Sequence, residues 1–376
     1  MRHLFVKIKD FIRSLDIVLL LACLCCSAIS MISLYSFWKT GQIRFQIVLT
    51  QGIAILIGIV AALVLSAIDY ETLAKLWKIH MPAAVFLVLL TFTPLGYNPT
   101  GGAADDQAWL NLGFTSLQPS ELLKLSFILT FALHLSKVGD NINHLRPFLL
   151  LCLHGAVPTI LIMLQGDFGS ALVFFVIFVM MMFVAGLSVK WIAVGLVAGA
   201  AAAPFIWFFI LPDYLKQRFF VALHPEIDRT GKGLQQFHGR LAFGSGELFG
   251  KGAGGDDLYN KVPKAHNDFI FSYIGQIFGF VGALLVLLLL TLLCVKILMT
   301  AKMSRDRLGN FICVGVFTMF LFQSIINIGM VLCLIPVIGI TLPFFSAGGT
   351  SVVVSYMAVG LAMSVYRQNK KDLMFD

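Results

Sequence analysis

Three acidic residues and one basic residue lie inside or at the edge of long apolar runs, where ionisable groups are costly and are usually paired or functional. These residues are Glu121, Lys124, Asp167 and Asp268. Asp268 stands where a long polar loop ends and the apolar sequence Phe269-Ile270-Phe271 begins. A carboxylate at this boundary is placed to take a proton from a molecule that is half lipid and half polar. Asp268 is therefore the candidate catalytic residue.

Glu121 and Lys124 are three residues apart, so a helix places both on one face, where they can form an ion pair. The preceding Gln118-Pro119-Ser120 predicts a helix start, with Pro119 in the first turn and Ser120 or Glu121 as the cap. The ion pair is either structural or the wall of a polar cavity that faces a substrate. Both interpretations can hold together.

Asp167 and Asp268 also have simpler interpretations. Asp167 lies in the turn Gln165–Ser170, and Asp268 follows Asn267, so each could cap the helix that begins there. His266 is expected to be a local hydrogen-bond partner of Asp268. No two of the eight histidines have the spacing of a metal-binding helix motif, so we expect no metal–histidine site.

The composition indicates the framework that must position these residues. The 376 residues are 59% hydrophobic and 12% charged, whereas soluble chains carry roughly a quarter charged residues. The apolar runs are about 20 residues long, which is the length that crosses a bilayer core. We predict an all-α polytopic membrane protein with one membrane domain over 1–376, since the alternation of a membrane barrel is absent. Ten spans are expected near 17–37, 45–67, 77–95, 117–136, 147–164, 168–187, 190–211, 268–295, 309–332 and 349–366.

The distribution of basic residues predicts the orientation. Lys and Arg gather in one set of short connections and at both chain ends, whereas the short loops of the other set hold only Lys39 and Arg44. By the positive-inside rule, both termini are cytoplasmic in the inner membrane, with an interfacial amphipathic segment at 1–15. The loop 212–267 and Asp268 then face outward. This topology accounts for the net charge of +8 without a nucleic-acid partner.

The polar loop and the C-terminal third contain the remaining signals. Glycines at 244–246 and 250–252 predict tight turns that let the backbone approach a ligand or the membrane surface. The sequence around Gly250 lacks the spacing of a phosphate-binding loop, so we expect no nucleotide site. Pro336, Pro343 and the glycines at 348–349 predict a broken, partly re-entrant backbone that lines a cavity. The seven cysteines lie in or beside apolar runs and predict neither disulfides nor metal ligands.

Four motifs occur in a fixed order along the chain. They are Gln118-Pro119-Ser120-Glu121 with Lys124, the turn Gln165–Gly169, the junction Pro263–Phe271, and NIGM through LPF.S.GG at 327–349. Together they resemble the SEDS family (shape, elongation, division and sporulation), over nearly the whole chain. The motif at 327–330 and the short tails are closer to RodA than to FtsW.

The resemblance implies a peptidoglycan glycosyltransferase that polymerises lipid II, an undecaprenyl-diphosphate-linked disaccharide-pentapeptide, during cell elongation and shape maintenance. It also implies a class B penicillin-binding protein as partner and no cofactor. In this family Asp268 corresponds to the essential carboxylate, and we expect it to act as general base. Cationic residues should stabilise the departing lipid diphosphate. The candidate substrate-binding residues are Trp109, Glu121, Lys124, Asp167, Arg240, Lys251, His266 and Ser346.

The chain departs from the family pattern near the expected site. Ala108 replaces an arginine, and Gln276 and Ile277 replace paired acids. Asp105 and Asp106 are additional acids, which either recruit a divalent cation or are solvated acids of a loop. Two alternative functions therefore stay open. The protein could flip a lipid-linked precursor, since broken helices and embedded charges also occur in transporters, or it could be an inactive scaffold that recruits a penicillin-binding protein.

Overall fold

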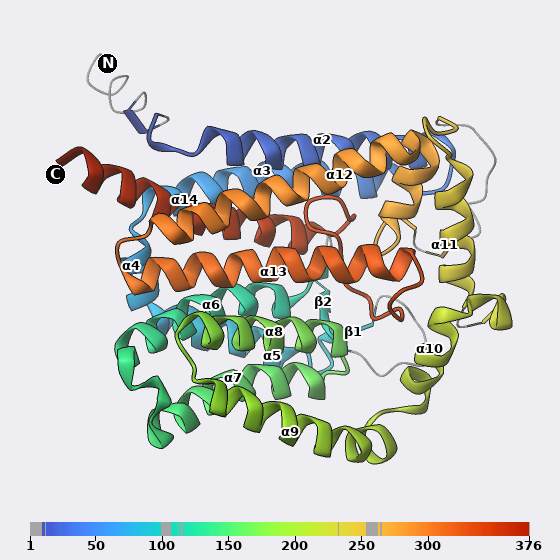
Figure 1. Cartoon of the computed structure of the whole chain (residues 1–376). Helices are drawn as coiled ribbons and strands as arrows, with labels where there is room; N and C mark the ends of the chain where they lie inside the picture. Colours follow the sequence, from blue (N-terminus) through green and yellow to red (C-terminus); the bar gives the residue numbers. More distant parts are fainter. Residues whose placement is uncertain are drawn as a thin grey trace.

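The computed structural model describes residues 10–98, 107–231, 233–252 and 262–375, apart from 12, 112, 114, 115 and 264. The described chain folds into a bundle of long helices (Figure 1). Asp105 and Asp106, and most of the expected N-terminal amphipathic segment, lie outside the described residues.

Long apolar helices make up the bundle. Within the described residues, eight helices are long and apolar enough to cross a membrane, and two shorter apolar helices accompany them. The eight are α2 (Ile17–Lys39), α3 (Phe45–Ala67), α6 (Pro119–Val138), α7 (Leu145–Leu164), α9 (Val189–Phe205), α12 (Ile270–Met303), α13 (Arg307–Val331) and α14 (Gly349–Phe375). The shorter two are α5 (Trp77–Leu90) and α8 (Phe168–Val184). The predicted helical membrane fold is confirmed, and each expected span overlaps one of these helices, although ten crossings stay a prediction.

Short elements connect the long helices. They are α4 (Tyr70–Lys75), β1 (Gly96–Tyr97), β2 (Trp109–Asn111), β3 (Ser116–Leu117), η1 (Gly139–Asn143), the π-helical η2 (Ile206–Ile210), α10 (Asp213–Leu223), η3 (Pro225–Asp228) and α11 (Leu234–Ser245). The strands form a small antiparallel sheet in the order β1-β2-β3. The predicted outer loop 212–267 therefore contains helices in its described part.

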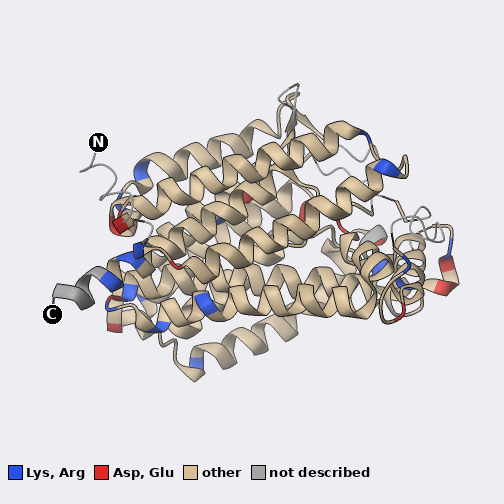
Figure 2. Cartoon of the chain, turned by 90° about the horizontal axis from the view of Figure 1, so that it is seen from above, with Lys and Arg blue, Asp and Glu red and all other residues tan. Residues whose placement is uncertain are grey.

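The two ends of the bundle differ in charge. Both termini lie at one end, and α10 and α11 lie at the other (Figure 1). Figure 2 shows many of the Lys and Arg residues at the end with the termini. Because no membrane is present, the orientation with both termini cytoplasmic stays a prediction.

Small residues let the helices pack closely. A methyl group on Gly58 of α3 would stand 2.8 Å from the ring of Tyr356 on α14, and one on Gly360 would stand 2.7 Å from the carbonyl oxygen of Ala62. Such close approach is typical of helix pairs in membranes, where van der Waals contact drives association. The hydroxyl group of Tyr356 also forms a hydrogen bond of 2.8 Å with the hydroxyl group of Ser27 on α2.

Helix α12 breaks at Gly279, which has φ 66° and ψ −162°. The peptide N–H groups of Phe280 and Val281, just after the break, donate to the carbonyls of Glu247 and Leu248 at 2.8 and 3.1 Å. A methyl group on Gly250 would stand 2.0 Å from the carbonyl oxygen of Ile277. The glycine-rich turn after α11 therefore packs on the backbone of α12. Its approach to a ligand or to the membrane surface stays a prediction.

The segment between α13 and α14 is irregular, as predicted, and its residues around Phe344 are buried. Phe344 and Phe345 are 1% and 0% exposed within it, and Phe344 has a positive φ of 67°. Figure 1 shows this segment turning back into the bundle. Irregular backbone at membrane depth is tolerated where protein surrounds it.

Candidate functional site

A small polar pocket lies among α6, α8, α13 and the irregular segment. It is lined by Gln118, Glu121, Lys124, Ser170, Val173, Gln323, Gly339, Ile340 and Thr341. Its volume is about 10 Å³, which is close to the least space that holds one water molecule. A sugar could enter only if part of the wall moved, and residues 339–341 are the part without regular secondary structure.

The predicted ion pair stands in this pocket. Lys124 Nζ lies 2.7 Å from Glu121 Oε1, and the two residues are 1% and 5% exposed. The predicted cap is wrong, because α6 begins at Pro119 with Gln118 in the N-cap position. Glu121 is instead a first-turn acid that faces Lys124 one turn later, so each charge compensates the other inside the bundle.

Asp167 is a capping residue and also contacts the pocket. Its Oδ1 accepts the N–H of Ser170 at 2.9 Å and caps α8. Its Oδ2 accepts from Gln118 Nε2 at 3.0 Å. The capping interpretation holds, and the second contact joins Asp167 to the residue that precedes α6.

Asp268 lies half-buried in the turn before α12, beside the same pocket. Phe269 has the N-cap position of α12, so Asp268 is one residue outside the cap. The Oδ2 atom of Asp268 is 3.9 Å from the point where a Cβ on Gly339 would stand. Gly339 is exposed and lines the pocket, so the carboxylate stands near the accessible edge of the polar pocket.

His266 and Ser346 help to hold this region together. The carbonyl of His266 accepts the N–H of Ala347 at 2.9 Å, and its ring meets Phe37 edge-on at 6.3 Å between centroids. The Oγ of Ser346 accepts the N–H of Leu342 at 2.8 Å, and Ser346 is 1% exposed. These contacts shape the turn and the irregular segment.

Trp109 lies in the small sheet near the start of α6. It pairs with Tyr97 on β1, so the two side chains share a face of the sheet. Thr350 of α14 joins the sheet to α6, because its Oγ1 donates to the carbonyl of Ser116 at 3.2 Å and accepts the N–H of Gln118 at 3.3 Å.

Arg240 and Lys251 are not among the residues that line the polar pocket. Arg240 is exposed on α11, with its Nη2 3.6 Å from Glu226 Oε2. The backbone N–H of Glu226, its bond with His224 and the charge of Arg240 lower the pKa of this carboxyl, so the pair stays charged at neutral pH. Lys251 is exposed, and its backbone N–H donates to the carbonyl of Gln276 at 2.9 Å.

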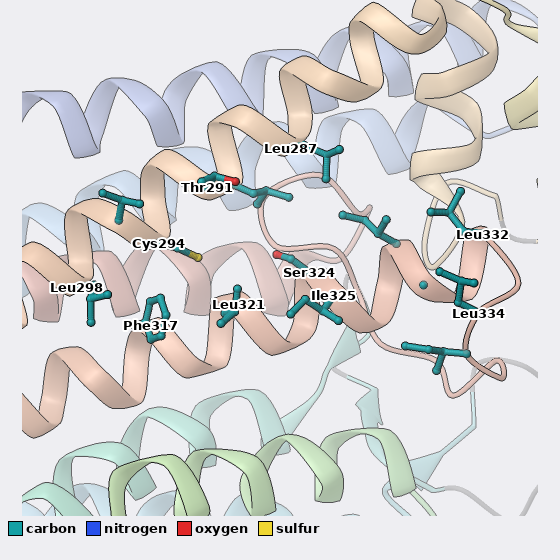
Figure 3. Close-up of a pocket in the computed structure, with 15 residues that line it drawn as sticks. Leu287, Thr291, Cys294, Leu298, Phe317, Leu321, Ser324, Ile325, Leu332 and Leu334 are labelled. Carbon is teal, nitrogen blue, oxygen red and sulfur yellow. The ribbon is translucent and has the colours of Figure 1, made fainter. Parts of the chain in front are cut away.

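A larger hollow lies between α12 and α13 and is almost entirely apolar. It measures about 550 Å³ and is open to the outside of the bundle (Figure 3). Leu287, Phe317, Leu321, Ile325 and Leu334 are among its lining residues. No carboxylate or amine of the described residues lines the hollow. It can therefore hold an apolar chain or helix, but it offers no such group to act as a general acid or base.

Two features were missed by the sequence reasoning. His134 and His154 meet across α6 and α7, with their Nδ1 atoms 3.1 Å apart, although their spacing in the chain shows no motif. Asn327 on α13 donates hydrogen bonds to the carbonyls of Asp268 and Ile340. In the described part of the chain, no three His, Cys, Asp or Glu residues gather as metal ligands would. Whether Asp105 and Asp106 recruit a divalent cation or are solvated loop acids stays open, because both lie outside the described residues.

Comparison with known proteins agrees with this geometry. A family model described as "Cell cycle protein", for FtsW, RodA and SpoVE, matches residues 13–371. The chain is 30% identical over 371 residues to a probable peptidoglycan glycosyltransferase FtsW of Geobacter metallireducens, covering 96% of each chain. It is 31% identical over 298 residues to the peptidoglycan glycosyltransferase MrdB of Escherichia coli, covering 78% of this chain and 79% of the relative.

A solved structure has the same fold over almost the whole chain. It comes from work on the structural coordination of polymerization and crosslinking by a peptidoglycan synthase complex. The TM-score is 0.81 at 27% identity, covering 95% of this chain and 99% of the other. The match of the family model to nearly every residue and the polar pocket built from the expected motifs lead to one conclusion: this chain belongs to the FtsW/RodA/SpoVE family, the SEDS family.

Proposed function

We propose that this protein is a glycosyltransferase that polymerises lipid II into glycan strands at the outer face of the cytoplasmic membrane. The observation that carries the proposal is the place of Asp268, whose carboxylate stands beside the exposed Gly339 at the edge of the pocket that contains Glu121 and Lys124. The name peptidoglycan glycosyltransferase, given to relatives that cover most of the chain, supports the same chemistry.

The reaction joins two lipid-linked glycans. The acceptor hydroxyl attacks the anomeric carbon of the donor, the new C–O bond forms, and the bond from that carbon to the diphosphate oxygen breaks. Asp268 takes the hydroxyl proton as general base. The lipid diphosphate leaves with the electron pair and gains negative charge, which cations stabilise. Lys124 would do so from within the pocket, whereas Arg240 and Lys251 would hold diphosphate groups at the outer surface.

The other expected residues would form the walls of the site. Glu121 orients Lys124 through their ion pair, and Asp167 fixes Gln118 at the pocket edge. Trp109 offers an aromatic face to a sugar ring, while His266 and Ser346 hold the turn and the irregular segment that must shift to admit the substrate. The small volume of the pocket makes such an opening a requirement of the proposal.

The proposed partner is a class B penicillin-binding protein, which crosslinks the peptides of the new strands. A related structure comes from a synthase complex that couples polymerization with crosslinking. The apolar hollow between α12 and α13 is the surface we assign to a membrane-spanning helix of this partner, because it is large, exposed and free of charge. We further propose a role in cell elongation, from the motif at 327–330, although the FtsW relative matches 96% of the chain and MrdB matches 78%.

Purified protein and fluorescent lipid II test the proposal, with polymer length read on a gel in the presence and absence of the partner. Asp268→Asn should abolish polymer formation. Asp213→Asn is the matched control, because Asp213 is an exposed acid at the start of α10 and is remote from the polar pocket in its contacts. Equal polymer from Asp268→Asn and the parent would refute the base assignment. Transport of labelled lipid across vesicles by Asp268→Asn would favour the flippase, and partner binding without polymer would favour the scaffold.

A further inference from the structure

Asn327 joins the two segments that meet at the carboxylate of Asp268. It lies on α13 and is 0% exposed. Its Nδ2 donates to the carbonyl of Asp268 at 2.8 Å and to the carbonyl of Ile340 at 2.7 Å. Only the NH₂ group of the side-chain amide can donate to two carbonyl oxygens. The two partners therefore determine which way the amide of Asn327 points.

Both bonds hold backbone carbonyls that lie outside the helices and strands. Asp268 lies in a turn before α12, and Ile340 lies in a stretch without regular secondary structure. Gly339 precedes Ile340 and has φ 70°, and a Cβ on it would stand 3.9 Å from Asp268 Oδ2. Many residues of α13 are buried, so Asn327 ties both backbone segments to a packed helix.

The Oδ1 atom of Asn327 indicates that this residue does more than stabilise the fold. Asn327 Oδ1 is buried and accepts no hydrogen bond within the described structure. A buried acceptor without a partner is unfavourable, and each such group in a folded protein calls for an explanation. Gln323, one turn earlier on α13, lines the polar pocket, so the same helix face meets the site.

We propose that Asn327 is a positioning residue that holds the backbone of Asp268 against helix α13, so that the carboxylate keeps its place when the irregular segment shifts and the pocket admits the acceptor sugar. This inference rests on the proposed glycosyl transfer. It assigns to Asn327 a geometric role and leaves proton transfer to Asp268. Because a displacement of about 1 Å at a reacting group can cost about 100-fold in rate, loss of the tie should slow turnover more than it weakens binding.

The test compares Asn327→Leu and Asn327→Asp with the parent, using fluorescent lipid II. Both variants keep a side chain of similar size, but neither has an amine that can donate to two carbonyls. We expect turnover per bound lipid II to fall about 10- to 100-fold, with the dissociation constant changed less than about threefold. Dividing the turnover by the amount of bound lipid II counts only folded protein. A smaller folded fraction therefore cannot produce the expected fall in turnover.

Thr318→Val is the matched control on the same helix. Thr318 is 3% exposed, and its hydroxyl donates to the carbonyl of Val314 within α13, so this variant should keep the parent turnover. A second arm places Asn327→Leu in an Asp268→Glu background. If Asn327 acts through Asp268, the Asn327→Leu change should reduce turnover much less in the Asp268→Glu background than in the parent, because the effects of coupled residues are not additive.

The outcomes separate this inference from the proposed function. The positioning role would be overturned if both Asn327 variants kept the parent turnover per bound lipid II. It would also be overturned if Asn327→Leu reduced turnover equally in the parent and in the Asp268→Glu background. Polymerisation by Asp268→Asn at the parent rate would instead overturn the proposed base and, with it, the role assigned to Asn327.

Discussion

The buried ion pair of Glu121 and Lys124 can be tested by removing each charge alone and then both together. The Nζ and Oε1 atoms are 2.7 Å apart, and the side chains are 1% and 7% exposed. Removing one partner of such a pair leaves a buried uncompensated charge, which costs about 3–5 kcal/mol. We expect Glu121→Gln and Lys124→Met each to destabilise the protein by about this amount, and the double variant to recover most of the loss.

Unfolding by denaturing detergent in mixed micelles, followed by tryptophan fluorescence, measures these free energies. The pair between Lys75 and Glu71 supplies the control, because its atoms are 2.8 Å apart while its side chains are 67% and 47% exposed. Glu71→Gln should therefore change the free energy of unfolding by less than about 1 kcal/mol. If Glu121→Gln were as stable as Glu71→Gln, the burial argument would be wrong.

The same variants separate the two interpretations of the pair. If Lys124 faces the lipid diphosphate, the double variant should stay inactive in lipid II polymerisation although its stability returns. Polymerisation at the parent rate by the double variant would show that the pair is structural only.

Three further predictions concern backbone and surface positions. Gly339→Ala should slow polymerisation and cost about 1–2 kcal/mol, because Gly339 has φ 70° and the new methyl group would stand 3.9 Å from Asp268 Oδ2; unchanged rate and unfolding midpoint would contradict this. Gly250→Ala should lower the unfolding midpoint, because its methyl group would stand 2.0 Å from the carbonyl oxygen of Ile277, and an unchanged midpoint in thermal unfolding would show that the loop yields freely. Leu321→Trp should fill the hollow between α12 and α13 and weaken co-purification of the penicillin-binding partner, whereas full partner capture would exclude this surface as the docking site.

Much of the fold could be predicted because hydrophobic length is a strong local signal. Each expected span overlaps an apolar helix, and the spacing of Glu121 and Lys124 was enough to predict their ion pair. The irregular segment before α14 was also foreseen, because Pro336 and Pro343 interrupt an otherwise apolar sequence.

The remaining features depend on contacts between distant segments. The break in α12 at Gly279 could not be predicted, since its freed N–H groups are satisfied by Glu247 and Leu248 of another segment. Strands of two or three residues are too short to show a period, so the sheet that holds Trp109 was missed. The pairing of His134 with His154 depends on the register of α6 against α7, which their spacing in the chain does not determine.

The most direct test of the account is the single-turnover rate of glycosidic bond formation with lipid II already bound. Asp268→Asn should bind lipid II as tightly as the parent and form the bond at least about 100-fold more slowly, because a general base contributes about 10²–10⁴-fold. A parent rate in Asp268→Asn, measured at full occupancy, would contradict the claim that this carboxylate takes the proton.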